Sequence, residues 1–186
     1  MYTTGPYVPR QQLYGLHQPR PSSEAVWQAA WPFIISTILA CFMIISVLAI
    51  GALETASLAI STDNDLYGNT SSTGAGFWCG VFAFNAALLI IITNLARHTR
   101  FWATIAMIAN VIAIGFSVIL LALDAKAVQD GNDRFSSLPR KSKVLAAQLA
   151  FAILQVVLCV IFISIYTVVF TWTYGRSNMQ QRGRVF

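Results

Sequence analysis

The sequence predicts an all-α integral membrane protein with four transmembrane helices and with both termini on the cytoplasmic side. Of the 186 residues, 56% are hydrophobic and only 10% are charged, and the mean hydropathy is +0.64. Soluble domains usually carry about 25% charged residues, so this chain has too little polar surface to cover a water-soluble globule. The apolar residues also fall into four long runs without a charged residue, a pattern typical of lipid-facing helices.

The N-terminal segment, residues 1–22, is rich in Pro, Gln and Tyr and has no compact apolar stretch. We therefore expect a disordered cytoplasmic tail rather than a cleaved signal peptide, so that the first span directs insertion. Ser22 or Ser23 can cap a short helix that follows this tail. Trp27 and Trp31 share one face of that helix at the edge of an apolar run, and such tryptophans predict interfacial anchors.

Four apolar runs predict the spans of a transmembrane domain that covers residues 23–174. At 1.5 Å per residue, each run is long enough to cross the roughly 30 Å of hydrocarbon in a bilayer. The expected spans are residues 31–53, 74–96, 101–123 and 144–172.

The segments between the runs predict how the spans connect. A polar loop follows the first span, and a short basic turn makes the second and third spans a tight antiparallel hairpin. A second polar loop, residues 124–143, precedes the fourth span, which is longer than a bilayer requires and must tilt or project beyond it. Residues 175–186 form a cytoplasmic C-terminal tail.

The charges that flank the runs predict the orientation. Seven arginines lie in the tails and the short turn, five bases lie in the loop 124–143, and the loop after the first span has none. Cytoplasmic segments carry the excess of Lys and Arg, which favours cytoplasmic termini, although the basic cluster before the fourth span points the other way. The loop after the first span also contains the sequon Asn69-Thr70-Ser71, which predicts a glycosylated Asn69 outside the cytosol.

The sequence contains no residue pattern for catalysis or for cofactor binding. It has no HExxH, GxSxG or CxxC motif and no phosphate-binding glycine loop, and its two histidines, His17 and His98, lie in the tail and the short turn. We therefore expect no enzyme activity, no cofactor and no metal. Glu54, at the end of the first span, could be an ion site, but a carboxylate at such a point is more often solvated. The basic residues flank apolar runs and are expected to contact anionic lipid headgroups, not nucleic acid.

Small residues recur at helical spacing in three of the predicted spans, which predicts close helix packing. They are Gly76 and Gly80 in the second span, Ala109, Ala113 and Ser117 in the third, and Ala146 and Ala150 in the fourth. Such rows serve packing within the bundle or, alternatively, a homodimer face. Cys41 and Cys159 fall near mid-span, where cysteine acts as a small apolar residue.

Asn85 in the second span and Asn110 in the third lie about equally far along their helices from the turn that joins them, so they share a depth. An unpaired carboxamide is costly in hydrocarbon. We therefore predict a hydrogen-bonded clasp between the two side chains. The alternatives are that each bonds its own helix or another span, or that one faces a partner protein or the pore of an oligomer.

Topology and one short motif provide a resemblance to a known family. The loops lack the cysteines that tetraspanins, claudins and connexins carry, whereas the run Gly76-Phe77-Trp78-Cys79-Gly80-Val81-Phe82 resembles the Gly/aromatic-Trp-x-Gly entry of the CD20-like superfamily of membrane-spanning four-domain proteins, which includes sarcospan. That resemblance implies a non-enzymatic protein that forms oligomers and associates with receptors or adhesion complexes. It also implies a family in which some members modulate cation flux.

The same class follows by elimination, because a chain without catalytic groups or a pore stripe has mainly its helix faces for function. We predict an accessory or organising subunit of a receptor, adhesion or channel complex. Its expected partners are the lipid bilayer and other membrane proteins, in the plasma membrane or in endosomal or vesicle membranes. The alternatives are an oligomeric cation channel or channel modulator, and a MARVEL-type vesicle membrane protein.

Overall fold

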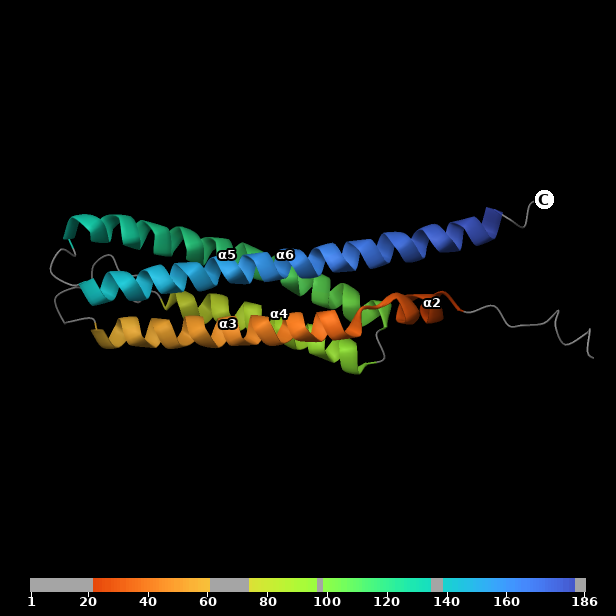
Figure 1. Ribbon diagram of the computed structural model, residues 1–186, viewed down its shortest axis with the longest axis horizontal. Helices are drawn as coiled ribbons and strands as arrows, with labels where there is room; N and C mark the ends of the chain where they lie inside the picture. The colour runs from red at the N-terminus through yellow and green to blue at the C-terminus, as the bar shows by residue number, and fades with distance from the viewer. Residues whose placement is uncertain (1–21, 61–73, 97–98, 135–138, 183–186) are drawn as a thin grey trace, which may run out of the picture.

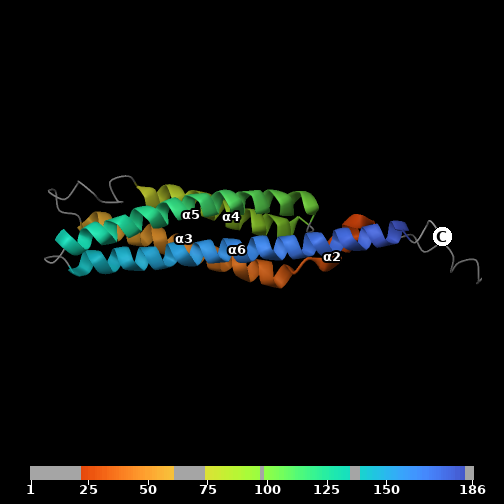
Figure 2. The same cartoon turned by 90° about the horizontal axis from the view of Figure 1, so that it is seen from above.

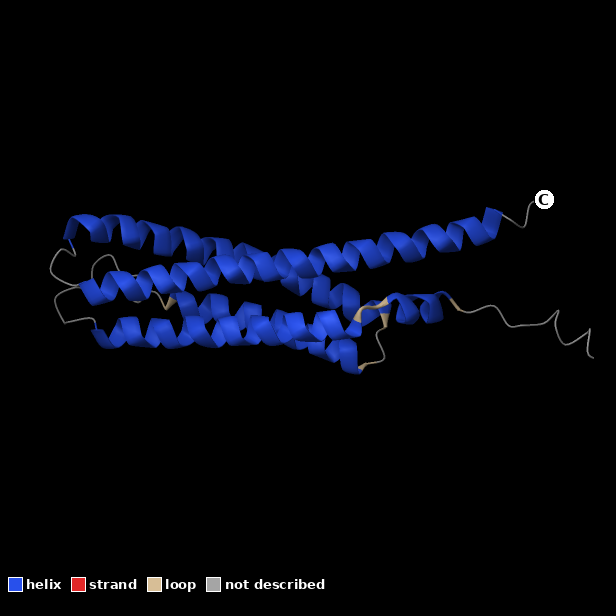
Figure 3. Ribbon diagram, viewed as in Figure 1, coloured by secondary structure: helices blue, strands red, loops and turns tan. Residues whose placement is uncertain are grey.

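The computed structural model describes residues 22–60, 74–96, 99–134 and 139–182, and the regular elements in these ranges are all helices (Figure 1, Figure 3). In chain order they are α2 (Ser23–Ala30), α3 (Phe33–Ile60), α4 (Ala75–Leu95), α5 (Arg100–Arg134) and α6 (Pro139–Arg182).

Each of the four long helices contains a stretch that is long and apolar enough to cross a membrane. These stretches are Phe33–Ser57, Ala75–Leu95, Arg100–Lys126 and Lys143–Arg176. The predicted all-helical class with four candidate spans is therefore confirmed. The short helix α2 has only 8 residues and precedes the first of them.

The long helices form an antiparallel bundle in which each helix packs on its neighbour in the chain and α3 also packs on α6 (Figure 1, Figure 2). Helix α2 packs on the C-terminal half of α6. We call the end of the bundle that contains α2, Leu95 and Arg100 the tail end. The opposite end, where Ser57 and Ala75 lie, is the loop end.

Helices α5 and α6 are longer than the predicted spans. The expected polar loop over residues 124–143 is mostly helix, because α5 continues to Arg134 and α6 begins at Pro139. Polar residues mark where a chain leaves hydrocarbon, but Lys, Gln, Ala and Asp do not stop a helix that has already formed. Proline is favoured at the first position of a helix, which explains the start of α6.

Helix α2 begins as the sequence predicts. The hydroxyl of Ser22 accepts a hydrogen bond from the backbone N–H of Ala25 at 3.2 Å, so Ser22 is the N-cap. The helix ends at Ala30, and Trp31 is extended, with ψ of 123°, because Pro32 disfavours a helical conformation in the residue before it.

With the exception of Leu158, the buried residues of α5 and α6 follow one another at alternating intervals of three and four. In α5 they are Ala103, Ala106, Asn110, Ala113, Ser117, Leu120 and Asp124; in α6 the same spacing relates Leu145, Gln148, Ala152, Gln155, Cys159, Phe162, Tyr166, Val169 and Thr173. This repeat is that of helices that pack at a shallow left-handed crossing angle. One face of each helix therefore points inward along its whole length, and it carries the buried polar residues as well as the apolar ones.

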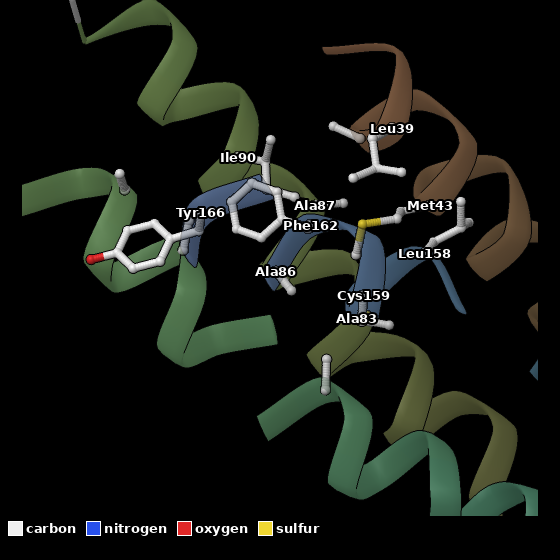
Figure 4. Packing of buried hydrophobic residues seen from close by; sticks show 14 of the residues in the cluster. Leu39, Met43, Ala83, Ala86, Ala87, Ile90, Leu158, Cys159, Phe162 and Tyr166 are labelled. Carbon is white, nitrogen blue, oxygen red and sulfur yellow. The ribbon is translucent and has the colours of Figure 1, made fainter. Parts of the chain in front are cut away.

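Phe162 is the largest side chain in the centre of the bundle. It is fully buried, and Figure 4 shows its ring beside Ile90 and Ala87 of α4. Alanines on the facing helix leave room for the ring, so large and small residues alternate across this layer. Cys159, one turn away, is buried in the same cluster and packs as the sequence predicts, whereas Cys41 is exposed.

The predicted small-residue rows have different environments. Gly76 and Gly80 are buried on the face of α4 that meets α3. Ala113 and Ser117 are buried and Ala109 is half-buried, so this row also serves packing within the bundle. Ala146 and Ala150 are exposed on α6, so this row is not part of the buried core.

Replacing Phe162 with Ala should lower the free energy of unfolding by about 3–5 kcal/mol, because the surrounding alanines cannot fill the cavity. The matched control is Phe42→Ala, since Phe42 is 54% exposed on the outer face of α3. Unfolding in bicelles measures both changes. A loss from Phe42→Ala as large as that from Phe162→Ala would contradict this description of the core.

Candidate functional site

Glu54 is buried inside the bundle near the loop end, with none of its surface exposed. It lies on the inward face of α3, one turn beyond Ile50 and one turn before Ser57, both of which are also buried. Its Oε2 accepts a hydrogen bond of 2.7 Å from Nε2 of Gln148, on the inward face of α6. The expectation that Glu54 is solvated is therefore wrong, because the inward face of α3 continues past the predicted end of the span.

Gly76 provides the space for the Glu54 carboxylate. A Cβ at position 76 would lie 2.9 Å from Oε2 of Glu54, closer than real Cβ contacts, and 3.3 Å from Nε2 of Gln148, which is a tight contact. Since Gly76 is the second residue of α4, the carboxylate lies beside the N-terminal end of that helix. The partial positive charge of a helix N-terminus favours a negatively charged group at this position.

A second buried carboxylate, Asp124, lies on the inward face of α5 at the same end of the bundle. Cys79 of α4 is within electrostatic reach of both Asp124 and Glu54, and its thiol contacts the backbone of Leu120, one turn from Asp124. Each of the four long helices thus contributes to one polar region. We call Glu54, Ser57, Gly76, Cys79, Asp124 and Gln148 the carboxylate layer.

Three oxygen atoms of the carboxylate layer are buried without a hydrogen-bond partner among the described residues. They are Oε1 of Glu54, Oε1 of Gln148 and Oγ of Ser57. Buried polar oxygens are usually paired in folded proteins, so three in one layer indicate a site for a group that accepts their lone pairs. Within the described ranges, no cluster of three or more His, Cys, Asp or Glu residues is arranged to hold a metal ion.

A second polar cluster joins three segments at the tail end. Oδ1 of Asn94, in α4, accepts hydrogen bonds of 3.0 Å from the indole N–H of Trp31 and from the hydroxyl of Ser36. Its Nδ2 donates to the hydroxyl of Thr37 at 2.9 Å. We call these four residues the amide clasp, which fixes the start of α3 against the end of α4.

The two tryptophans predicted as interfacial anchors pack inside protein. Trp27 is fully buried and Trp31 is 5% exposed; their ring centroids are 5.6 Å apart, and Trp27 is 5.8 Å from the ring of Tyr166. Their rings therefore do not face lipid, and the anchor interpretation is corrected. Helix α2 packs on α6, so the face that carries the tryptophans meets a helix.

Helix α2 is also held by a polar contact with the start of α5. Oε1 of Glu24 accepts a hydrogen bond of 3.0 Å from the backbone N–H of Arg100, the first residue of α5. The guanidinium of Arg100 donates to the carbonyl of Ser23 at 2.7 Å and lies 5.5 Å from the ring of Trp27. Glu24 thereby caps a free N–H group of another helix.

The predicted clasp between Asn85 and Asn110 is wrong. Asn110 is fully buried, and its Nδ2 donates to the carbonyl of Ala106 in its own helix at 2.8 Å. Asn85 is exposed on the outside of α4. Equal distance from the turn gives two residues the same depth, but the direction of each side chain around its helix decides whether they meet.

Asn85 lies at the edge of a groove between α3 and α4. The groove has a volume of about 480 Å³ and is lined mainly by apolar groups, among them Val47, Gly51, Gly80 and Val81. Gly76 also contributes to its wall, so this residue separates the groove from the Glu54 carboxylate. The predicted positions Asn69, His17 and His98 lie outside the described residues.

Comparisons with protein-family models, with curated proteins and with solved structures find no match for this chain. The CD20-like resemblance therefore stays a prediction that depends on the motif at residues 76–82. In the structure, this motif supplies Gly76 and Cys79 to the carboxylate layer and Gly80 to the contact with α3.

Sequence reasoning missed Gln148 and Asp124 as members of the site. A signal for both was available, because each continues the three-and-four spacing of small or apolar residues in its own helix. Ser117, Leu120 and Asp124 follow this spacing in α5, and Gln148, Ala152 and Gln155 follow it in α6.

Replacing Gly76 with Ala should lower the free energy of unfolding by about 1–3 kcal/mol, because the new Cβ forces a buried, hydrogen-bonded carboxylate to move. Gly80→Ala is the matched control, one turn away on the same helix. Its Cβ would meet only Val47 at 3.6 Å, an ordinary contact, so the change should be neutral or slightly stabilising. Equal losses for the two variants in thermal unfolding would contradict the role given to Gly76.

The amide clasp should give a coupling energy between Trp31 and Asn94 of about 0.6 kcal/mol, and at most about 1.7, as is usual for hydrogen bonds between membrane helices. A double-mutant cycle with Trp31→Phe and Asn94→Leu measures this energy. The control cycle pairs Trp31→Phe with Asn85→Leu, for which we expect additive losses. Additive losses in the first cycle would show that the bond contributes nothing to stability.

Proposed function

We propose that this protein is a non-enzymatic, four-span accessory or organising subunit that binds a transmembrane helix of a larger membrane protein. The binding surface is the groove between α3 and α4. The observation that carries the proposal is the position of Asn85, which is exposed at the midpoint of α4 and at the edge of this groove.

Exposed hydroxyl side chains on the long helices bond to their own backbone. The hydroxyls of Thr55, Ser164 and Thr167 each donate to the carbonyl four residues earlier, at 2.8 Å. Within the described part of the chain, Asn85 has no such bond, although its carboxamide would lie at the centre of the bilayer. A carboxamide in hydrocarbon seeks a hydrogen-bonding partner, and a helix from another protein can provide one.

The shape of the groove suits a single helix. A Cβ at Gly51 would have no atom within 4 Å, so the wall of α3 is open at this point and a helix backbone can approach closely. Two copies of this chain placed groove to groove would bring two concave surfaces together and leave both unfilled. We therefore assign the groove to one apolar helix that carries a small residue and a hydrogen-bonding side chain at the depth of Asn85.

This assignment agrees with the function expected from the sequence. A subunit that presents a helix-binding groove and carries no enzymatic function fits a receptor, adhesion or channel complex in the plasma membrane or an endosomal or vesicle membrane. An oligomeric cation channel is the alternative, in which Asn85 would contact a second copy of this chain. The accessory-subunit proposal and the oligomeric-channel alternative predict complexes of different mass.

The proposal predicts a specific cross-link from the groove. A photoreactive amino acid at Val81, which is 53% exposed and lines the groove, should cross-link in native membranes to a membrane-spanning peptide of another protein. Gly51→Leu should reduce this product at least about tenfold by filling the groove. The matched control is Gly115→Leu, since Gly115 lies on α5 with open space around it. Mass spectrometry identifies the cross-linked peptide.

Three outcomes would overturn the proposal. A product with the mass of two copies of this chain would assign the groove to a homo-oligomer. A product unaffected by Gly51→Leu would show that the groove is not used. Equal cross-linking from Val160, which is 48% exposed on α6, would show unspecific contact.

A further inference from the structure

We infer that the carboxylate layer binds one monovalent alkali cation inside the bundle at the loop end. This site is distinct from the groove between α3 and α4, and it would stand if the proposed partner helix did not exist.

The first argument is the set of oxygen atoms. Oε1 of Glu54, Oε1 of Gln148 and Oγ of Ser57 are buried and have no hydrogen-bond partner among the described residues. Glu54 and Ser57 lie one turn apart on the same face of α3, and Gln148 is bonded directly to Glu54. The bond from Nε2 of Gln148 to the carboxylate fixes the orientation of the amide, because only its nitrogen can donate. Its oxygen is therefore left to act as a ligand.

The second argument is charge. Glu54 forms no ion pair with any residue that the structure describes, and it is completely buried. A carboxylate in such a position is costly unless a positive charge compensates for it.

The ligand chemistry selects the class of ion. Carboxylate, amide and hydroxyl oxygens favour hard cations, and the three unpartnered atoms include no nitrogen or sulfur. Glu54 supplies one negative charge, which one monovalent cation balances. The described residues also contain no group of three or more His, Cys, Asp or Glu suited to a metal. One positive charge beside Glu54 therefore fits the layer better than a divalent ion.

The layer is closed toward the centre of the bundle. Ile50, Leu120 and Ala152 lie one turn deeper than Glu54, Asp124 and Gln148, respectively, and all three are buried in one apolar cluster with Cys79. A cation that reaches the layer has an apolar barrier below it. The carboxylate layer is therefore a cation-binding site at the loop end of the bundle, not part of a continuous pore through the chain.

The experiment measures the thermal unfolding midpoint of the full-length protein in detergent, with chloride salts of sodium, potassium, calcium and choline at matched ionic strength. Sodium should raise the midpoint above that in choline by about 3 °C or more, and the rise should saturate with concentration. Retention of radiolabelled sodium should approach one ion per chain. Glu54→Gln should abolish both effects, whereas Glu24→Gln, at the tail end, should keep them.

A second pair of variants keeps the test decisive if Glu54→Gln does not fold. Ser57→Ala removes one ligand and should raise the sodium concentration at half effect about tenfold. Ser46→Ala is its matched control, because Ser46 is a buried serine on the same helix that is bonded to the carbonyl of Phe151. In Ser46→Ala, the sodium concentration at half effect should not change.

Other results would overturn the inference. They are equal midpoints in sodium and choline, a sodium effect that survives both Glu54→Gln and Ser57→Ala, and a rise seen with calcium alone. A midpoint that changes with pH but not with sodium would show that the layer takes up a proton instead of a metal cation.

Discussion

A carboxylate held inside an apolar bundle is the constraint on which the arrangement of the helices depends. Glu54 can be buried only where α3 presents it to Gln148 and where α4 has no side chain at position 76. If α3 turned by one residue, Glu54 would point toward lipid and a different residue would face Gly76. The carboxylate therefore fixes the rotation of α3 about its axis and its position relative to α4 and α6.

The amide clasp does the same at the other end of the bundle. Asn94 joins the end of α4 to Trp31 and to the first turn of α3, so polar contacts fix the register of α3 and α4 at this end, as the Glu54–Gln148 bond fixes α3 against α6 at the other. Between the ends, Phe162 and the alanines of α4 supply shape but no directional bond. Hydrogen bonds between membrane helices are individually weak, so the polar residues select one arrangement and the packed apolar residues supply most of the stability.

Composition and charge-free runs were enough to predict the helical class and four spans, because lipid forces every backbone polar group to pair within a helix. The cap at Ser22 was also predictable, since it depends on neighbouring residues. The direction of side chains across the bundle was not, because it depends on all four helices at once. Asn85 and Asn110 share a depth but face different neighbours, and Trp27 meets α6 because α2 packs on that helix. The burial of Glu54 could have been anticipated from the inward spacing of Ile50, Glu54 and Ser57.

The position of Gly76 connects the two surfaces of α4. On one side its missing side chain admits the Glu54 carboxylate, and on the other it forms part of the wall of the groove. Any side chain at this position would act on both, so its replacement cannot distinguish a cation site from a helix-binding groove. Gly51 lines the groove and is absent from the carboxylate layer, whereas Ser57 belongs to the layer and not to the groove. Variants at Gly51 and Ser57 can therefore test the two surfaces one at a time, because a change at Gly51 leaves the carboxylate layer intact and a change at Ser57 leaves the groove intact.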